Sequence, residues 1–366
     1  MTVLRANTIS GLGTDGPVFD GSLEFNSQNY VILPKGTTGD RVGLGSTAGA
    51  LRYNTDSNKV ELYDGNQWVE VQSSIPATGG PRGVFGGGSA TNILDYITIT
   101  STGNAVDFGD LTQARQEGGA LSSQTRGVWT GHSIPLAGGQ TMDYVTISST
   151  GNATSFGNLT VSRQTMGGGA NSTRGIWAGG YAPTGRVNVI EYITIAQTGN
   201  AIDFGDLSTV NAGPIPAASS TRCVIAGGNN PASTNTIEFI TIATLGNAAD
   251  FGDLTRSENQ MSSVSNATRA VFASGASNNN ILDYITIATL GNAVRFGDLN
   301  RTNTYAMSSA SSPTRGVFAG GGYPSPTNEM SYITILTQGN AVDFGDLTSN
   351  RALMMRGICS NAHGGL

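Results

Sequence analysis

The sequence predicts an all-β fold assembled from a repeated unit of four short strands. Three observations on the 366-residue chain lead to this prediction. A Phe-Gly-(Asp/Asn)-Leu motif occurs six times, and its phenylalanines are spaced by 48, 48, 47, 45 and 48 residues. A (Tyr/Phe)-(Ile/Val)-Thr-Ile motif precedes it in every copy. Glycine is abundant (52 residues) and only 12% of the residues are charged, a composition that favours turns and short strands over long amphipathic helices.

Each copy contains four segments with strand character. The first is an arginine followed by a short apolar run that ends in glycines, and the second is the tyrosine motif, which alternates apolar residues with threonine at the period of a strand. A Gly-Asn turn leads into the third segment, around Phe-Gly, and a fourth segment of small residues follows, such as residues 118–123. Four antiparallel strands in a period of about 45–50 residues are typical of one blade of a β-propeller.

The number of small-residue segments predicts that the propeller closes on itself. The first copy begins at Arg82 with no such segment before it, whereas the sixth is followed by an additional one around Met355–Ser360. The count balances if the C-terminal strand completes the first blade, an arrangement that removes exposed sheet edges. We therefore predict a six-bladed β-propeller over residues 82–366, with the small-residue strands nearest its axis.

The order of the motifs resembles that of the kelch family. A diglycine follows an apolar strand, and then come a tyrosine strand, an aromatic strand and a downstream arginine, over Arg82–Leu366. The chain departs from kelch proteins in having Phe where that family usually has Trp, and Thr-Ile where it has an acidic residue after Tyr. The resemblance implies a kelch-like architecture. The six closely similar YITI…GNA.DFGDLT copies are also similar to arrays in bacteriophage tail fibres and other virion proteins, especially those of phages of marine bacteria.

Residues 1–75 do not contain the repeat and predict a separate, small β-rich module. Gly49–Val71 contains three strand-like runs, and Asp64-Gly65 between the last two is a strong hairpin signal. The module is too short to bury a sufficient core alone, so we expect it to oligomerise. Residues 76–81 are expected to link it to the propeller.

The stretch from Gly49 to Trp68 is similar to a module of phage tail fibres that lies in intertwined trimers. The matching residues are Gly49, Arg52, Tyr53, Asn54, Thr55, Glu61, Tyr63, Gly65 and Trp68. The resemblance implies a homotrimer that attaches to other virion tail proteins; composition alone indicates only that the module needs a partner. The residues assigned to the oligomerisation module are Arg52, Tyr53, Asn54, Glu61, Tyr63 and Trp68.

Charge and hydropathy exclude several classes of protein. The net charge of −6 provides no cationic surface for nucleic acid. No apolar run reaches about 18 residues, so we expect no membrane insertion. The N-terminal sequence lacks the apolar segment of a secretory signal, and two cysteines cannot form a disulfide framework, which indicates folding in a cytoplasm. We expect Cys223 and Cys359 to be buried free thiols.

The sequence offers little to catalysis or metal binding, so we predict no enzymatic activity, no cofactor and no metal site. The two histidines, His132 and His363, are expected to be solvated, and no Cys/His/Asp cluster has the spacing of a zinc site. Trp129 and Trp177 occupy positions that are Phe in other copies, and we expect them in the core. The repeated arginines and aspartates are expected to support the blades. They are Arg82, Arg126, Arg174, Arg222, Arg269, Arg315, Asp107, Asp110, Asp203, Asp206, Asp250, Asp253, Asp298, Asp343 and Asp346.

The segments between the diglycine strand and the tyrosine strand differ from copy to copy, whereas the Gly-Asn turn hardly varies. Alternate loops of an up-and-down blade emerge on opposite faces, so the variable segments share one face with the connections that precede the small-residue strands. Binding residues concentrate on loops that a rigid scaffold carries. The candidates for receptor binding on this face are His132, Tyr181, Arg186, Asn229, Asn278 and Tyr323.

These features predict a phage virion structural protein, a tail fibre or adhesin that is made in the host cytoplasm and works in the virion tail. Its N-terminal module would attach it to the tail, and three sets of propeller loops would bind a glycan or protein of the host surface. Two alternatives stay open: a non-receptor docking component of the virion, and a polysaccharide-degrading tail enzyme. The enzyme would need paired carboxylates. The variable loops offer Asp95, Asp143, Glu191, Glu238, Asp283 and Glu329.

Overall fold

A computed structural model describes residues 33–41, 48–57, 59–70, 81–131, 139–276, 279–302 and 304–366. Apart from one 3-10 turn at Thr38–Arg41, the regular structure in these ranges consists of β-strands, which confirms the all-β prediction. The contacts divide the chain into two compact units, Met1–Ile75 and Pro76–Leu366. The predicted linker, 76–81, lies outside the described residues except for Pro81.

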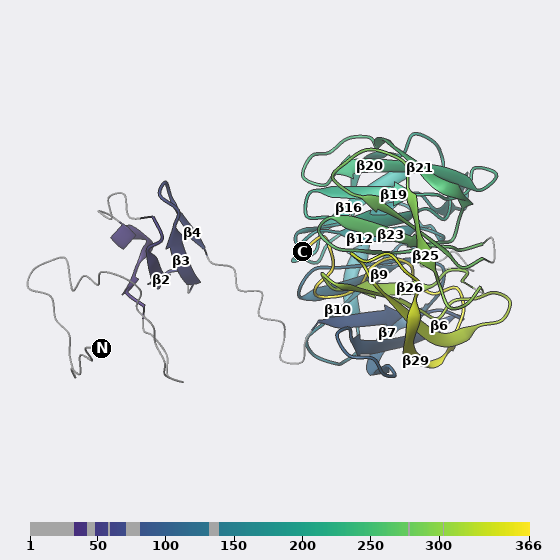
Figure 1. The fold of residues 1–366 in the computed structure, drawn as a ribbon, viewed down its shortest axis with the longest axis horizontal. Helices are drawn as coiled ribbons and strands as arrows, with labels where there is room; N and C mark the ends of the chain where they lie inside the picture. The colour runs from purple at the N-terminus through teal and green to yellow at the C-terminus, as the bar shows by residue number, and fades with distance from the viewer. Residues whose placement is uncertain are drawn as a thin grey trace, which may run out of the picture. The chain divides into compact units, whose positions relative to one another are not determined.

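The first unit contains one sheet with the order β1-β2-β3-β4. Figure 1 labels β2, β3 and β4. Its strands are β1 (Lys35–Gly36), β2 (Leu51–Asn54), β3 (Lys59–Tyr63) and β4 (Trp68–Glu70). β2, β3 and β4 are antiparallel neighbours, and β1 pairs with β2 in parallel. The turn between β3 and β4 begins at Asp64, whose carboxylate accepts hydrogen bonds from the amides of Asn66 (2.7 Å) and Gln67 (2.8 Å). The hairpin predicted at Asp64-Gly65 is therefore confirmed.

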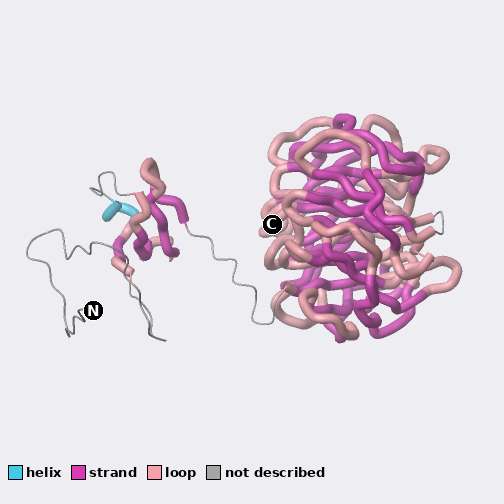
Figure 2. The backbone as a smooth tube through the Cα atoms, in the orientation of Figure 1, coloured by secondary structure: helices cyan, strands magenta, loops and turns pink. Residues whose placement is uncertain are grey.

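Strands dominate the second unit (Figure 2), and in the described residues they form six successive sheets. Sheet 1 contains β5 (Arg82–Gly86), β6 (Thr91–Thr98) and β7 (Val106–Arg115). Sheet 2 contains β8 (Gly119–Ser122), β9 (Arg126–Thr130), β10 (Thr141–Thr146) and β11 (Thr154–Asn158). Sheet 3 contains β12 (Gly167–Ala170), β13 (Arg174–Ala178), β16 (Val189–Thr194) and β17 (Ile202–Asp206). A small hairpin, β14 (Tyr181–Ala182) and β15 (Gly185–Arg186), lies between β13 and β16.

The remaining three sheets repeat the same antiparallel order. Sheet 4 contains β18 (Ile215–Ala218), β19 (Arg222–Ala226), β20 (Thr234–Thr241) and β21 (Ala249–Glu258). Sheet 5 contains β22 (Ser262–Ser265), β23 (Arg269–Ala273), β24 (Ile281–Thr286) and β25 (Val294–Asp298). Sheet 6 contains β26 (Ser308–Ser311), β27 (Arg315–Ala319), β28 (Thr327–Thr334) and β29 (Val342–Arg351).

The C-terminal segment pairs with sheet 1. Gly83 and Ser360 form an antiparallel bridge, and the amide of Val84 donates to the carbonyl of Cys359 (3.0 Å). The segment that the sequence predicts beside the first copy, Met355–Ser360, therefore lies along β5. Neighbouring first strands also contact one another from sheet to sheet: β8 with β12, β12 with β18, β18 with β22, β22 with β26, and β26 with β5.

The Gly-Asn turn of each sheet bonds the Phe-Gly strand of the preceding sheet. Between sheets 2 and 3, the amide of Gly199 donates to the carbonyl of Phe156 (2.8 Å), and the amide of Ala201 donates to that of Asn158 (2.8 Å). The side chain of Asn200 completes the junction, because its Oδ1 accepts from the Asn158 amide (3.0 Å). The same pair of backbone bonds occurs at all six junctions. The repeated residues therefore form a strand within each copy and also the hydrogen bonds between neighbouring copies.

The junction between the last sheet and the first has the same form. The amide of Gly103 donates to the carbonyl of Phe344 (2.7 Å), and the amide of Ala105 donates to that of Asp346 (2.7 Å). The Asp346 amide in turn donates to Oδ1 of Asn104 (3.1 Å). Sheet 6 therefore binds sheet 1 through the residues that join consecutive sheets elsewhere.

The glycine of the Phe-Gly motif permits this close approach. Gly109 has a φ of +139°, and a Cβ at this position would lie 2.5 Å from the carbonyl oxygen of Gly151 in the next sheet. No side chain fits at that distance, and the left-handed φ disfavours other residues in any case. Gly345 faces the carbonyl of Gly103 in the same way.

The recurring arginines also connect neighbouring sheets. Arg315 stacks on the Tyr332 ring of its own sheet, with Cζ 4.3 Å from the ring centroid, and its Nη1 donates to the carbonyl of Ile99 in sheet 1 (3.0 Å). The other five arginines make the equivalent pair of contacts. These contacts confirm the expected supporting role of the six arginines.

The cores lie between sheets rather than within one. Phe204 of sheet 3 is 2% exposed and packs in a cluster that includes Ile240 and Ile242 of sheet 4. Its ring meets Tyr192 edge-on at a centroid distance of 6.0 Å. Trp129 and Trp177 are fully buried, as predicted.

Both cysteines are buried and free, as the sequence predicts. Burial raises the pKa of the Cys223 thiol to about 12, so this group stays protonated near neutral pH. Burial also raises the pKa of the Cys359 thiol, so neither thiol is suited to metal binding or nucleophilic chemistry.

We predict that Phe204→Ala lowers the free energy of unfolding by about 3–5 kcal/mol, because it leaves a cavity between sheets 3 and 4. Chemical denaturation measures this loss. Ile202→Ala is the matched control, since Ile202 lies two residues earlier in β17 and is 56% exposed. Its effect should be about 0.5 kcal/mol or less. Equal losses in the two variants would contradict a core placed between sheets.

Candidate functional site

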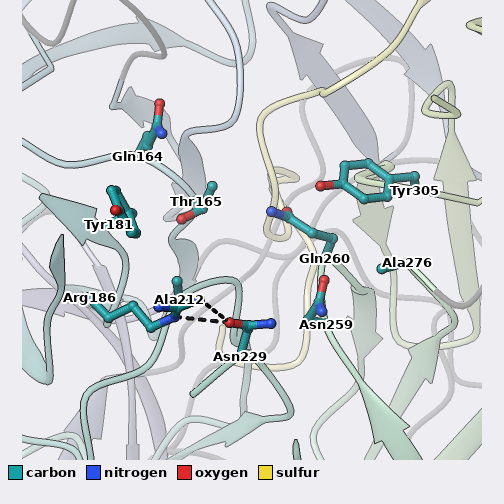
Figure 3. Close-up of a pocket in the computed structure, with 10 residues that line it drawn as sticks. All are labelled: Gln164, Thr165, Tyr181, Arg186, Ala212, Asn229, Asn259, Gln260, Ala276 and Tyr305. Atoms are coloured by element: carbon teal, nitrogen blue, oxygen red, sulfur yellow. Dashed lines mark hydrogen bonds between the residues drawn. The ribbon is translucent and has the colours of Figure 1, made fainter. Parts of the chain in front are cut away.

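A pocket of about 460 Å³ opens among the connecting loops of sheets 3 to 6 (Figure 3). Its lining comes from two kinds of loop. Variable segments between the first two apolar motifs of a copy provide Tyr181, Arg186, Asn229 and Ala276. Connections that precede the small-residue strands provide Gln164, Thr165, Ala212, Asn259, Gln260 and Tyr305. These are the two kinds of loop that the sequence predicts on one face.

Three of the residues predicted from the sequence meet in this pocket. Tyr181 and Arg186 are paired across the β14–β15 hairpin, and the guanidinium of Arg186 lies 6.0 Å from the Tyr181 ring centroid. Arg186 donates from both Nε (2.9 Å) and Nη2 (2.5 Å) to Oδ1 of Asn229, as Figure 3 shows. Tyr181 is 40% exposed. The hairpin of sheet 3 is thereby fixed to the variable loop of sheet 4.

Tyr323, a fourth predicted residue, is not among the described residues that line this pocket. Tyr323 is 63% exposed, and its ring centroid lies 6.1 Å from that of Tyr305, which does line the pocket. Tyr323 therefore extends the aromatic surface at the sheet 6 side. His132 and Asn278 lie outside the described residues.

A closed ring of backbone hydrogen bonds lies at the pocket. Each member lies two residues before the first strand of one of sheets 2 to 6 or before the C-terminal segment that begins at Met355, and all have φ between +50° and +78°: Glu117, Thr165, Gly213, Gln260, Ala306 and Leu353. The amide of each member donates to the carbonyl of the member before it: Thr165 to Glu117, Gly213 to Thr165, Gln260 to Gly213, and Ala306 to Gln260. Two further bonds close the ring, from the amide of Met354 to the carbonyl of Ala306 and from the amide of Glu117 to the carbonyl of Leu353. We call this set the backbone ring. Two of its members, Thr165 and Gln260, line the pocket.

Arg356 forms hydrogen bonds with Gly213 of the backbone ring and with residues next to two other members. Its amide donates to the carbonyl of Gly118 (2.9 Å), and its guanidinium donates to the carbonyls of Gly213 and Met166 (3.1 Å each). The side chain is fully buried, and burial lowers its pKa to about 10, so it remains charged near neutral pH. Burial also raises the pKa of the nearby Glu117 carboxyl. The hydrogen bonds of the backbone ring and of Arg356 therefore hold the backbone in place at the pocket.

Sequence reasoning did not single out Thr165, Gln260, Tyr305 or Arg356. The only available signal was their position, since the first three lie where the connection to the small-residue strand differs between copies. Arg356 lay in the segment recognised as a strand, and nothing in its local sequence indicates a side chain that reaches sheets 3 and 4.

Most of the carboxylates considered for an enzyme are buried in contacts between sheets. Asp143 of sheet 2 pairs with Arg115 of sheet 1 (3.0 Å), and both side chains are almost fully buried. Asp95 of sheet 1 pairs with Arg351 of sheet 6. The same kind of contact holds Glu191 to Arg163, Asp283 to Arg256, and Glu238 to the Ser208 amide. Glu329 differs, because its side chain is exposed and lies 3.8 Å from Arg301.

His363 is not solvated, so that expectation was wrong. It is 4% exposed, its Nε2 lies 2.7 Å from the carbonyl oxygen of Ser122, and its Nδ1 accepts from the Gly365 amide (3.1 Å). These contacts fit a neutral ring with the proton on Nε2. Burial lowers the pKa of His363 to about 4. The C-terminal tail therefore docks against the small-residue strands rather than extending into solvent.

Among the described residues, no three or more His, Cys, Asp and Glu side chains gather as metal ligands would. No helix in the described ranges is long and apolar enough to cross a lipid bilayer. The chain matches no known protein family, and no curated protein matches its sequence.

We predict that acid weakens the fold through His363. Its folded pKa of about 4 lies below the usual value of 6.5, so the stability that the neutral ring provides is complete above pH 6.5 and is lost as the pH falls toward 4. The loss attributable to this group is roughly 3 kcal/mol. Unfolding at pH 7 and pH 4.5 should show a steeper decline for the wild type than for His363→Gln, which cannot titrate. Parallel declines would contradict the assignment.

Proposed function

We propose that the second unit is a six-bladed, kelch-like β-propeller that the C-terminal strand closes. Two cycles of backbone hydrogen bonds support this reading. One joins each Phe-Gly strand to the next Gly-Asn turn and includes the pair Phe344 and Gly103, and the other is the backbone ring. The bridge between Gly83 and Ser360 supports the C-terminal segment as the missing strand of the first blade.

We propose that the protein is a phage virion structural protein, a tail fibre or adhesin whose propeller loops bind a receptor on the host cell surface. One observation carries this proposal: the pocket lies among the segments that differ between copies, whereas the hydrogen bonds of the six Gly-Asn turns use residues that the copies share. A scaffold with a repeated framework and individual loops is suited to recognition. The phage setting rests on the resemblance of the repeats and of the N-terminal module.

The N-terminal module is proposed to attach the protein to the tail as a homotrimer. The two faces of its sheet have opposite polarity. Glu61 is fully buried, accepts from Asn54 Nδ2 (2.8 Å), and pairs with Arg41 and, at 3.9 Å, with Arg52. Arg52 also lies 5.6 Å from the Trp68 ring centroid. These polar residues of the predicted oligomerisation module therefore bond within one chain.

The opposite face of this sheet is apolar and open. Leu51, Leu62 and Val69 are direct neighbours across β2, β3 and β4. Leu51 is 46% exposed and Val69 is 37% exposed. A row of apolar side chains at the surface of a small module is suited to contact with another chain. This row supports an apolar interface between copies, with the charged network fixing the shape of each one.

We predict that the double variant Leu51→Glu, Val69→Glu is monomeric, because it places charges in the proposed interface. Light scattering after size-exclusion chromatography gives the mass. Asn66→Glu, in the exposed turn between β3 and β4, is the control and should stay trimeric. A monomeric wild type, or a double variant that keeps the wild-type mass, would overturn the proposed interface.

The receptor-binding function is tested by incubating the purified protein with candidate bacterial hosts, marine strains included, and with their surface polysaccharides. The adhesin reading expects saturable binding to cells and no shortening of the polysaccharide. Released oligosaccharides would favour the tail enzyme instead, and the absence of both would favour the docking component.

We predict that Tyr181→Ala reduces binding to a susceptible host at least tenfold while the melting temperature stays within about 2 °C, because this side chain is exposed at the pocket. Leu245→Ala is the matched control, since Leu245 is 57% exposed in a Gly-Asn turn, away from the pocket-forming loops. Its binding should equal that of the wild type. A large fall in melting temperature for Tyr181→Ala would show that the residue is structural.

A further inference from the structure

Three buried side-chain oxygen atoms belong to residues that line the pocket and have no hydrogen-bond partner among the described residues. They are Oε1 of Gln164, Oγ1 of Thr165 and Oε1 of Gln260. Thr165 is 9% exposed and Gln260 is 7% exposed. Buried polar groups in proteins nearly always have partners, because leaving one unpaired costs about 1–3 kcal/mol. A cluster of three such atoms at one pocket therefore points to a ligand that supplies the missing bonds.

The backbone holds two of these side chains at the pocket at some cost. Thr165 has a φ of +52° and Gln260 a φ of +55°, a region that is unfavourable for residues with a Cβ and most of all for a β-branched one. Both are members of the backbone ring, where the equivalent positions include Gly213 and Ala306. The fold accepts residues without polar side chains at this position, so it does not itself require the Thr165 hydroxyl or the Gln260 amide.

The chemistry of the lining defines the ligand. All three unpaired atoms accept hydrogen bonds, so the ligand must be rich in donors. Burial raises the pKa of Tyr305, which keeps its hydroxyl protonated. Among the described residues that line the pocket there is no carboxylate, and the one cation, Arg186, is already bonded to Asn229. A neutral ligand with several hydroxyl groups fits this set better than a charged one.

The volume of the pocket and its aromatic side chains narrow the class of ligand further. Figure 3 shows the Gln260 amide and the Tyr305 hydroxyl pointing toward the space that separates them from Gln164 and Thr165. Tyr181 lies at the sheet 3 side of that space. The volume of about 460 Å³ is within the range of small-molecule sites, about 300–1,000 Å³. An extended protein epitope offers fewer donors in such a volume than a sugar ring does.

We propose that this pocket binds a neutral sugar residue of a bacterial surface glycan. Sugar hydroxyls donate to Gln164 Oε1, Thr165 Oγ1 and Gln260 Oε1, and the ring packs against Tyr181. This inference rests on the proposed receptor-binding function, because it names the class of receptor that the pocket takes.

The test uses the full-length protein and a panel of soluble sugars. Methyl glycosides of neutral hexoses and N-acetylhexosamines are titrated against the protein, with the corresponding uronic acids as charged counterparts. At least one neutral glycoside is expected to bind and the uronic acids to bind more weakly. Preference for the uronic acids, or no binding by any sugar, would overturn the proposal.

Two variants locate the bound sugar. Thr165→Val keeps the β-branched shape and removes Oγ1, and Gln164→Leu removes Oε1, so each should weaken binding roughly three- to tenfold. Ser308→Ala is the matched control: Ser308 also carries a buried Oγ without a partner in the described chain, but it lies in β26 and does not line the pocket. Equal affinities for wild type, Thr165→Val and Gln164→Leu would place the sugar elsewhere and contradict the inference.

Failure of this inference and failure of the proposed function give different results. If the protein binds host cells but no sugar, the receptor-binding function stands and the sugar assignment fails. If it binds a neutral sugar through Thr165 but no host cell, the pocket assignment stands and the adhesin reading fails.

Discussion

The hydrogen bonds between a Gly-Asn turn and the preceding Phe-Gly strand are the constraint on which the rest of the second unit depends. Each sheet buries its phenylalanine only when the next sheet lies against it, as Phe204 does against Ile240 and Ile242. A single copy therefore cannot complete a core, and the bond must recur at every junction. This requirement explains why the letters GNA and FGD hardly change, and why a glycine stands where the next carbonyl approaches.

The residues of the Gly-Asn junctions are not the residues that line the pocket, so the pocket loops can differ between copies. The hydrogen bonds of the Gly-Asn turns and buried pairs such as Arg115 with Asp143 hold neighbouring sheets together, and they involve none of the described residues that line the pocket. Individual copies can then carry a hairpin, as at Tyr181–Ala182, or an exposed tyrosine, as at Tyr323, without disturbing the junctions. Recognition by a rigid base with variable loops loses little conformational entropy on binding.

The residues that recur from copy to copy, and the places where the copies differ, predicted much of the fold and part of the site. The spacing of Phe-Gly located the strands of each sheet, the count of small-residue segments placed Met355–Ser360 beside the first copy, and the copy-to-copy differences indicated Tyr181, Arg186 and Asn229. What the sequence could not predict depends on contacts of single side chains that do not recur between copies, or on unusual backbone. Arg356 bonds Gly213, 143 residues away, and His363 contacts Ser122, 241 residues away. Thr165 and Gln260 line the pocket and have a positive φ, which no sequence motif predicts.

Hydrogen exchange at the junction of sheets 6 and 1 tests the central claim most directly. The amides of Gly103 and Ala105 donate to sheet 6, and those of Gly151 and Ala153 make the equivalent bonds between consecutive sheets. If the last sheet binds the first as every other pair of neighbours is bound, the two pairs of amides should exchange at similar, slow rates. Fast exchange at Gly103 and Ala105 beside slow exchange at Gly151 and Ala153 would show an open array and contradict the account.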